Sequence, residues 1–236
     1  MFEIFIFAPA ILLVCLGSQG PGQTPEPVSE VDPGVAIGVE VNRRVRLDFY
    51  TGREKSDELD SGKWKVGAGV SIRSKPLFKR FIDNFDSDKQ HVLVTGVTYE
   101  YSRASEADAK SIEHKLMLDA TARWAFAGNF LLSNRSRFEF RWIQDEYRFR
   151  YRNRLFLERE FKMKNLKFTP YGGAEAFWDQ KRKDWDHFRF TGGVQIPIYK
   201  RTSIDLYYER VRCTACANPN TNVIAANLNI FFRRKK

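Results

Sequence analysis

The chain has 236 residues and lacks any apolar run of about 20 residues, the length that a transmembrane helix needs. Its mean hydropathy is −0.46, so a bundle of membrane-spanning helices is excluded. Residues that bind metals are also scarce, because the chain has three cysteines and three histidines. A structural zinc site needs four such ligands, and Cys213 and Cys216 form the only close pair in the sequence. We therefore expect neither a metal nor another cofactor.

Aromatic residues, by contrast, are plentiful and make up 14% of the chain. That share is too high for a disordered protein, which lacks the apolar groups to form a core. The same chain is strongly basic, with a net charge of +10. The aromatic side chains therefore either form the core of a soluble protein or face a medium other than water.

The N-terminal segment has the pattern of an export signal. An apolar run from Ile4 to Leu16 is too short to span a bilayer as a helix, and the small residues Ser18 and Gly20 suit cleavage. Glu3 precedes this run where a positive charge is usual, and a buried N-terminal strand is the alternative interpretation. We predict a signal peptide over residues 1–20, a Pro-rich linker over 21–34, a folded domain over 35–232 and a basic tail over 233–236.

Cys213 and Cys216 lie next to turn-forming residues. Asn218, Pro219 and Asn220 follow the pair, whereas a redox-active Cys-x-x-Cys motif would open a helix. In an exported protein we expect the two cysteines to form a small loop disulfide, and a free pair is the alternative.

From residue 35 onward, apolar and polar residues alternate with a period of two, which indicates β-strands with two different faces. The clearest case is residues 147–161. Aromatic and aliphatic residues occupy one face there, and the other face carries Arg148, Arg150, Arg152 and Arg154. Four arginines on one face cannot pack against an apolar core without partners.

The predicted strands number about ten, in a range of about eight to twelve, and several have about ten residues or more. Ordinary strands average about 5–6 residues, whereas tilted strands that cross a membrane need about 9–11. Short connections such as 127–129 alternate with longer polar ones such as 103–110, as in outer-membrane barrels. An even number of strands would place both termini at the end with the short turns. The predicted strands cover residues 35–53, 63–73, 91–103, 110–126, 129–143, 147–161, 166–178, 186–198, 202–212 and 222–232.

Alternation alone does not say which face is buried. A soluble β-barrel turns its aromatic face inward, whereas a membrane barrel turns that face toward lipid and encloses the charges. Three features favour the membrane: both signs of charge occur on the polar face, aromatic residues such as Trp124 and Trp142 lie near strand ends, and the chain has an export signal. We therefore predict an all-β, up-and-down antiparallel transmembrane β-barrel with an Arg/Glu-lined interior and an aromatic and aliphatic exterior. A soluble β-barrel that binds a ligand is the alternative.

Four segments of the sequence resemble one known family. They are Tyr151-Arg-Asn-Arg-Leu-Phe-Leu-Glu, Phe168-Thr-Pro-Tyr-Gly-Gly-Ala-Glu-Ala-Phe, Phe188-Arg-Phe-Thr-Gly-Gly-Val and Ile204-Asp-Leu-Tyr-Tyr-Glu. The family is catalogued as domain of unknown function 2490 and is thought to consist of bacterial outer-membrane barrels. The resemblance implies this fold and an outer-membrane location over most of residues 35–232. It implies no activity, because the family has no established catalytic residues.

The polar face of the strands is the candidate functional site. A barrel of about ten strands has a narrow lumen that side chains fill. We predict a structural or largely plugged barrel in which the lumenal charges pair with one another. The alternative is an anion-selective pore, since arginine binds carboxylate and phosphate groups. The predicted lumenal residues are Arg137, Arg141, Arg148, Arg150, Arg152, Arg154, Arg189, Glu139, Glu158, Glu160, Glu175, Asp205 and Glu209.

Two further functions fit the sequence less well. A lipid-modifying enzyme would place an acid beside a histidine; the sequence offers Asp186 next to His187 and Glu113 next to His114, without a Gly-x-Ser-x-Gly motif. Basic residues are spread over nearly all predicted strands and no nucleic-acid-binding motif occurs, so we expect no nucleic-acid partner. We expect no enzymatic activity. The expected partners are outer-membrane lipid and the outer-membrane assembly machinery, and the sequence leaves the oligomeric state open.

Overall fold

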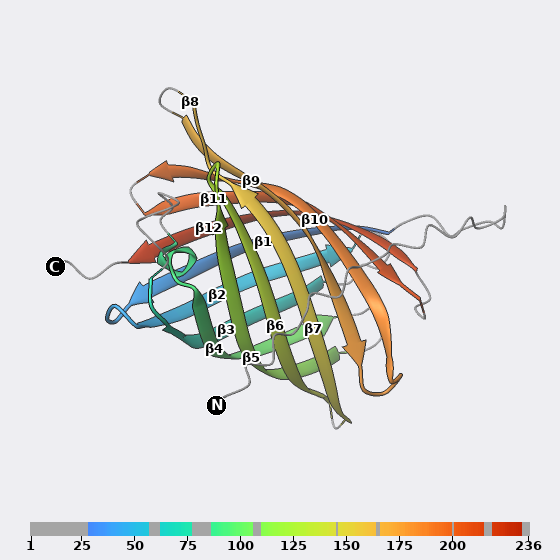
Figure 1. Ribbon diagram of the computed structural model, residues 1–236. Helices are drawn as coiled ribbons and strands as arrows, with labels where there is room; N and C mark the ends of the chain where they lie inside the picture. Colours follow the sequence, from blue (N-terminus) through green and yellow to red (C-terminus); the bar gives the residue numbers. More distant parts are fainter. Residues whose placement is uncertain are drawn as a thin grey trace, which may run out of the picture.

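The structure is a computed structural model, and it describes residues 28–56, 62–76, 86–105, 110–144, 146–163, 166–199, 201–214 and 219–232. Eleven long strands form a closed barrel, and one short strand, β8, extends a hairpin beyond its rim (Figure 1). No helical segment in these ranges is long and apolar enough to cross a membrane. The elements are β1 (Val28–Glu40), β2 (Val45–Ser56), β3 (Gly62–Arg73), the 3-10 turn η1 (Ser87–Gln90), β4 (Leu93–Ser105), β5 (Lys110–Phe126), β6 (Phe130–Ile143), β7 (Glu146–Arg159), β8 (Phe161–Met163), β9 (Leu166–Asp179), β10 (Asp184–Tyr199), β11 (Thr202–Cys213) and β12 (Asn220–Phe232).

The barrel strands follow one another in chain order, and each pairs antiparallel with the next. The exception is the closure, where β1 pairs parallel with β12. An odd number of strands requires this, because the first and last strands then run in the same direction. Eleven strands fall within the expected range of about eight to twelve, but the expectation of an even number with both termini at one end was wrong. We call the end where β12 finishes the turn end, and the end where β1 begins the loop end.

The extra strand arises where the sequence was interpreted as one strand over 35–53. The Asn42 side chain accepts hydrogen bonds from the backbone N–H groups of Arg44 (2.7 Å) and Val45 (2.9 Å), which closes a turn between β1 and β2. β1 also begins at Val28, so residues 28–34 are strand and not part of a linker. Proline is rare inside strands because it lacks a backbone N–H, and Pro33 accordingly has no partner in the β1–β2 ladder.

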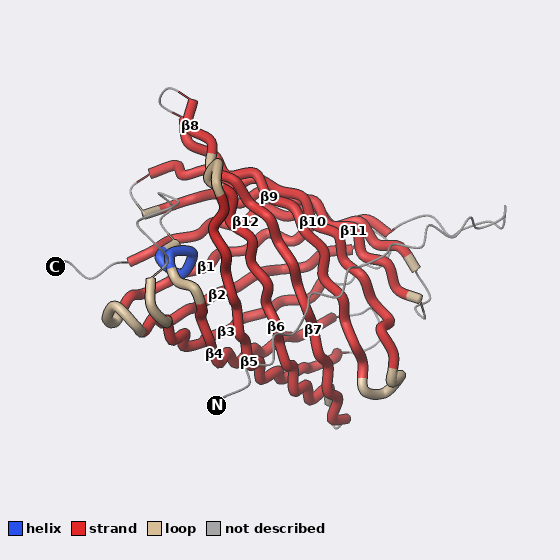
Figure 2. Tube along the Cα trace, in the orientation of Figure 1, coloured by secondary structure: helices blue, strands red, loops and turns tan. Residues whose placement is uncertain are grey.

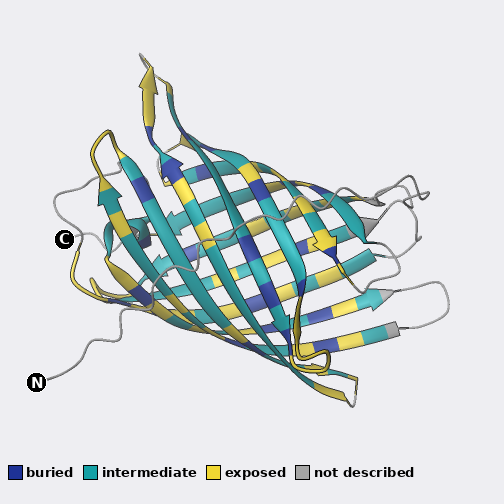
Figure 3. Ribbon diagram, turned by 45° about the vertical axis from the view of Figure 1, so that its right-hand side comes forward, coloured by how far each residue is buried: buried dark blue, intermediate teal, exposed yellow. Residues whose placement is uncertain are grey.

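The other predicted strands agree with the structure to within about two residues. The strands have 12 to 17 residues apart from β8. Exposed residues alternate with more buried ones along β3 and β11, and Figure 3 shows the burial classes interspersed along the barrel strands. Aromatic and aliphatic residues dominate the outward positions, and Trp124, Phe138 and Leu155 are among the exposed ones. Charged residues dominate the inward positions. The fold is therefore an all-β barrel with an apolar exterior, as the alternation predicted.

Two glycines in the segments that resemble the family make room for inward aromatic rings. A Cβ atom at Gly173 would lie 2.1 Å from Cδ1 of Phe156, and one at Gly193 would lie 2.6 Å from Cζ of Tyr171. The rings of Phe156 and Tyr171 stack with their centroids 5.6 Å apart. Each ring thus covers a glycine of the neighbouring strand. Such contacts fix the register between the two strands.

Several predictions fall on residues outside the described ranges. These are the signal peptide over 1–20, the first part of the linker over 21–27, the basic tail over 233–236, and Cys216 of the predicted disulfide. Cys213 is described and lies buried at the end of β11. The signal, the tail and the disulfide therefore stay predictions.

Candidate functional site

The lumen of the barrel contains a cavity of about 910 Å³. It is lined from Glu30 and Glu54 toward the loop end to Lys89 and Gln195 toward the turn end. Side chains therefore fill only part of the interior. A largely plugged barrel stays a prediction.

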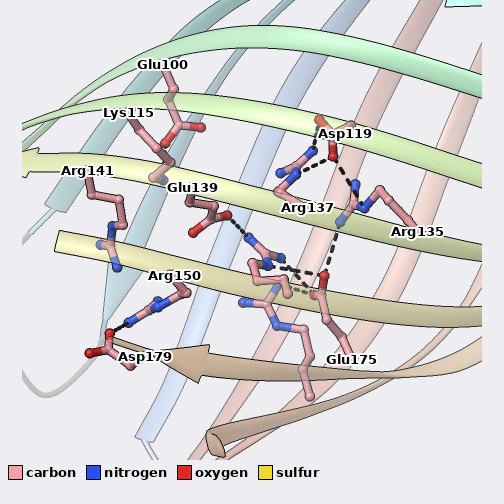
Figure 4. A network of polar contacts seen from close by, with 12 residues as sticks. Glu100, Lys115, Asp119, Arg135, Arg137, Glu139, Arg141, Arg150, Glu175 and Asp179 are labelled. Atoms are coloured by element: carbon pink, nitrogen blue, oxygen red, sulfur yellow. Dashed lines mark hydrogen bonds and ion pairs between the residues drawn. The ribbon is translucent and has the colours of Figure 1, made fainter. Parts of the chain in front are cut away.

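A strip of arginines from β6 and β7 covers one wall of this cavity (Figure 4). Arg152 lies at its centre and pairs with Glu139 at 2.7 Å and with Glu175 at 2.8 Å. Glu139 is 1% exposed. A carboxylate removed from water in this way needs a charged partner within contact distance, and Arg152 supplies it.

The neighbouring arginines pair with acids on the adjoining strands. Arg137 holds Asp119 of β5 through two hydrogen bonds of 2.6 and 3.1 Å, and Arg141 binds Glu113 of the same strand at 2.5 Å. Toward β9, Arg150 pairs with Asp179 at 3.3 Å. These ion pairs join β5 to β6, β6 to β7 and β7 to β9, so they brace the wall of the barrel across several strands.

The opposite wall carries charge of the other sign. β1 and β2 lie about half-way round the barrel from β6 and β7, and they contribute Glu30, Asp32, Asp48 and Glu54 to the cavity lining. Lys65 of β3 pairs with Asp32 at 2.8 Å and with Glu54 at 3.0 Å. The cavity therefore has an arginine-rich side that faces a side with more acids, and both sides carry their own ion pairs.

The connection between β3 and β4 places η1 at the mouth of the turn end, where Figure 2 shows it as the blue segment. Asp88 of η1 pairs with Arg73 of β3 at 2.5 Å and with Arg46 of β2 at 2.6 Å. Lys89, the next residue, pairs with Glu158 of β7 at 2.6 Å. We call the segment from Asp86 to Lys89 the plug segment.

Asp86 completes the attachment of the plug segment. Its carboxylate pairs with Arg46 at 2.6 Å and accepts a hydrogen bond from the backbone N–H of Asp88, which caps η1. Burial alone would raise the pKa of Asp86, but the charges of Arg46 and Lys89 outweigh burial and hold this pKa well below its usual range. Asp86 is therefore ionised at neutral pH and keeps its ion pair.

Arg154 differs from the paired arginines of this strip. Within the described ranges, Arg154 has no carboxylate at ion-pair distance, and its guanidinium lies over the ring of Phe156 at 4.3 Å from the centroid. Phe177 has a similar role beside Arg152, at 4.5 Å. Arg154 thus presents to the cavity a positive charge that, among the described residues, no carboxylate contacts at ion-pair distance.

The structure brings most of the predicted lumenal residues together and leaves two at the rims. Arg148 pairs with Glu146 at 2.5 Å at the loop end, and Glu160 pairs with Lys162 at 3.2 Å at the turn end; neither lines the cavity. Arg189 pairs with Glu209 at 3.4 Å. The predicted residues that line the cavity are Arg137, Arg141, Arg150, Arg152, Arg154, Arg189, Glu139, Glu158, Asp205 and Glu209, and Glu175 lies behind them in the wall.

Sequence reasoning missed several partners in the network. Asp119 and Glu113 stand on the polar face of a predicted strand, so their alternation with apolar neighbours was the available signal. The plug segment had a weaker signal, because its charges follow a run of apolar residues in a long connection. Nothing local in the sequence says that Asp88 and Lys89 reach opposite walls of one lumen.

The two acid–histidine pairs that are candidates for catalysis differ in geometry. His187 Nδ1 lies 2.6 Å from Asp186 at the loop end. His114 contacts the hydroxyl of Tyr99 at 2.6 Å on the outer face, whereas Glu113 faces inward toward Arg141. The structure therefore separates Glu113 from His114. Among the described residues, no group of three or more His, Cys, Asp or Glu side chains could hold a metal ion.

Two solved structures resemble the chain in fold. LpxR from Salmonella typhimurium matches with a TM-score of 0.52 and 9% identity over 84% of this chain and 87% of that one. The β domain of the Bordetella autotransporter BrkA matches with a TM-score of 0.50 and 9% identity over 78% of this chain and 82% of that one. At this identity the likeness shows a common barrel fold alone. No curated protein matches the chain by sequence.

A family model covers residues 61–220, from the start of β3 to the start of β12. It therefore includes the arginine strip, both glycine–aromatic contacts and the plug segment. The chain belongs to the family described as protein of unknown function (DUF2490).

Proposed function

We propose that the protein is an integral outer-membrane β-barrel whose lumen is closed at the turn end by its own plug segment, so that it has a structural role or conducts poorly. Barrel strands of 12 to 17 residues exceed the about 9–11 that a membrane crossing needs. The outward positions carry an apolar band with aromatic residues toward its edges, which suits hydrocarbon flanked by interfaces. Charged side chains, which are unfavourable in hydrocarbon, face the lumen.

The observation that carries the proposed closure is the attachment of the plug segment to opposite walls. Asp88 is tied to β2 and β3, while Lys89 is tied to Glu158 of β7 and to Gln195 of β10 at 3.2 Å. These two pairs of strands lie about half-way round the barrel from each other. A segment held from both sides crosses the mouth and cannot swing aside without breaking ion pairs.

Planar-bilayer recording tests the closure. The wild-type protein should show little conductance, and Lys89→Ala should raise it, because the substitution releases the plug segment from β7 and β10 while its ties to β2 and β3 stay. Lys162→Ala removes the same charge from an exposed side chain at the turn end, outside the plug segment, and serves as the control. Equal conductance of the wild type and Lys89→Ala would contradict the closure.

Membrane insertion has a separate test. After detergent extraction, the folded protein should migrate anomalously on a gel until it is boiled, because a closed barrel resists the detergent until heat opens it. A chain that stays monomeric and soluble without detergent would contradict the membrane barrel.

An anion-selective pore is the second candidate, and Arg154 favours it. This residue offers the cavity a positive charge without a paired carboxylate among the described residues. In a conducting form of the protein, Arg154→Ala should lower the chloride-to-potassium permeability ratio. Arg159→Ala is the matched control, because Arg159 is on the same strand but lies over Phe130 and Phe161 at the turn end. Unchanged selectivity in Arg154→Ala would reject this candidate.

A further inference from the structure

The outer face of the barrel carries a small pocket near the loop end. It has a volume of about 380 Å³ and is lined by Arg53 of β2, Gly62 and Trp64 of β3, and Arg103 of β4. The strand register aligns the three side chains, because Arg53 is the ladder partner of Trp64 and Trp64 is the partner of Arg103. Trp64 is 47% exposed, so this row faces away from the lumen.

Both arginines of this pocket are available to a ligand. In the part of the chain that the structure describes, neither guanidinium has a carboxylate at ion-pair distance, and both side chains are exposed. The outward positions of β2, β3 and β4 within those ranges carry no acidic residue: the acids of β2 and β4, such as Asp48, Glu54 and Glu100, belong to the lumen. Two like charges are thus held side by side without compensation.

The geometry suits one compact anion between the two arginines. Neighbouring strands lie about 4.8 Å apart, so the backbones of Arg53 and Arg103, which flank β3, are about 10 Å apart. Both side chains are long enough to converge over Trp64. Gly62 leaves the floor of the pocket open, and Nε and Nη2 of Arg53 already lie 3.5 Å from where a Cβ atom of residue 62 would be.

The surroundings of the pocket place it at a membrane interface. Trp64 makes an edge contact with Tyr101, with ring centroids 6.3 Å apart, and Tyr101 contacts His114 with centroids 5.4 Å apart. Tyr99 bonds the same histidine. Rings with a polar edge gather at the level of lipid headgroups, between hydrocarbon and water. An anion bound here would be part of a lipid.

We infer that Arg53 and Arg103 bind the phosphate of a lipid headgroup, with Trp64 packed against the adjoining part of the lipid. Guanidinium groups bind phosphate oxygens through paired hydrogen bonds, which lysine or histidine cannot reproduce. The inference rests on the proposed membrane barrel and adds a specific lipid site to it. The site lies at the loop end, so the lipid belongs to the leaflet into which that end projects.

Native mass spectrometry of the full chain, released from detergent with added lipid, tests the site. Phosphatidic acid supplies a lipid phosphate, phosphatidylcholine supplies a lipid whose phosphate is neutralised by choline, and inorganic phosphate supplies the free anion. The wild type should retain one phosphatidic acid in preference to phosphatidylcholine. The double variant Arg53→Gln/Arg103→Gln should bind it about tenfold more weakly or worse, because two charge-assisted contacts are lost.

The double variant Arg210→Gln/Arg212→Gln is the matched control. It removes two exposed arginines from β11 at the same end of the barrel but outside the pocket. If this control weakens binding as much as the pocket variant does, general surface charge explains the lipid and the site is refuted. Displacement of the lipid by millimolar inorganic phosphate would refute the lipid as the ligand.

Heat-modifiable migration of each variant distinguishes a failure of the lipid site from a failure of the membrane barrel. Variants that migrate like the wild type are folded barrels, so a loss of lipid in the pocket variant then reports on the site alone. If the wild type itself shows no heat-modifiable form, the proposed membrane barrel is refuted, and the lipid site that rests on it is refuted as well. A wild type that is heat-modifiable and binds both lipids equally would refute the site and leave the barrel standing.

Discussion

The lumenal arginines show how a single residue is kept charged away from bulk water. Arg152 is placed between Glu139 and Glu175, and Arg135 also reaches Glu175 at 3.2 Å. Replacement of a whole buried ion pair by apolar residues can be neutral, but removal of one partner leaves an unpaired charge. The acids at the centre of the network therefore matter more for stability than exposed acids of the same type.

Glu175→Gln should lower the free energy of unfolding by about 3 kcal/mol, because Arg135 and Arg152 each lose a partner. Glu146→Gln, which breaks an ion pair of Arg148 where both side chains are more exposed, should cost much less, because solvent screens that pair. Urea titration of the barrel in lipid, followed by tryptophan fluorescence, measures both. Similar losses of unfolding free energy in the two variants would show that water screens the lumenal ion pairs as effectively as it screens exposed ones.

The lowered pKa of Asp86 predicts how the plug segment responds to acid. Because this pKa is lower in the folded state, the stabilisation is fully present above the unfolded value of about 3.9 and is lost as the pH falls through the folded value. Asp86→Asn should be less stable than the wild type by about 1–3 kcal/mol at pH 6. The difference should shrink below about pH 3. A difference that stays constant with pH would assign the effect to the shape of the side chain.

At the scale of the strands, glycine and aromatic residues act in pairs. Phe156 of β7 lies over Gly173 of β9, and Tyr171 of β9 lies over Gly193 of β10. These contacts explain why the repeated Gly-Gly segments resemble each other: each serves the ring of the preceding barrel strand. They also fix the register of three consecutive strands, on which the alignment of the arginine strip depends.

Gly173→Ala should destabilise the barrel by about 1–3 kcal/mol, because the added methyl group would overlap the Phe156 ring and force it to move. Gly192→Ala is the matched control next to a second such glycine, since a Cβ atom there meets nothing within 4 Å. The same urea titration compares them. Equal effects would mean that loss of glycine flexibility, and not the ring, sets the cost.

At the scale of the whole molecule, closure depends on the parity of the strands. The turn at Asn42 adds one strand, and that strand makes β1 and β12 parallel neighbours. It also puts the start of β1 and the end of β12 at opposite ends of the barrel (Figure 1). A barrel of ten strands would have neither property.

Paired cysteines test the parallel closure. Val35 and Leu228 are register partners, so the variant Val35→Cys/Leu228→Cys should cross-link on mild oxidation. Val35→Cys/Ile224→Cys is offset by four residues, about 13 Å along the strand, and should not cross-link. Migration of the boiled protein under non-reducing conditions distinguishes the two, because a cross-link closes nearly the whole chain into a loop. Efficient cross-linking of the offset pair alone would contradict the register.

Local alternation was enough to predict the strands and their two faces, because a period of two is a property of neighbouring residues. It therefore predicted the all-β barrel, the outward aromatic face over residues 147–161 and most strand ends. The tertiary structure decided the number of strands, the attachment of the plug segment and the partner of each arginine. Those features join residues that are far apart in the chain, and the closure and stagger of the barrel bring them into contact. Arg154 illustrates this limit: in sequence it is equivalent to Arg152, and only the fold leaves it without an acid among the described residues.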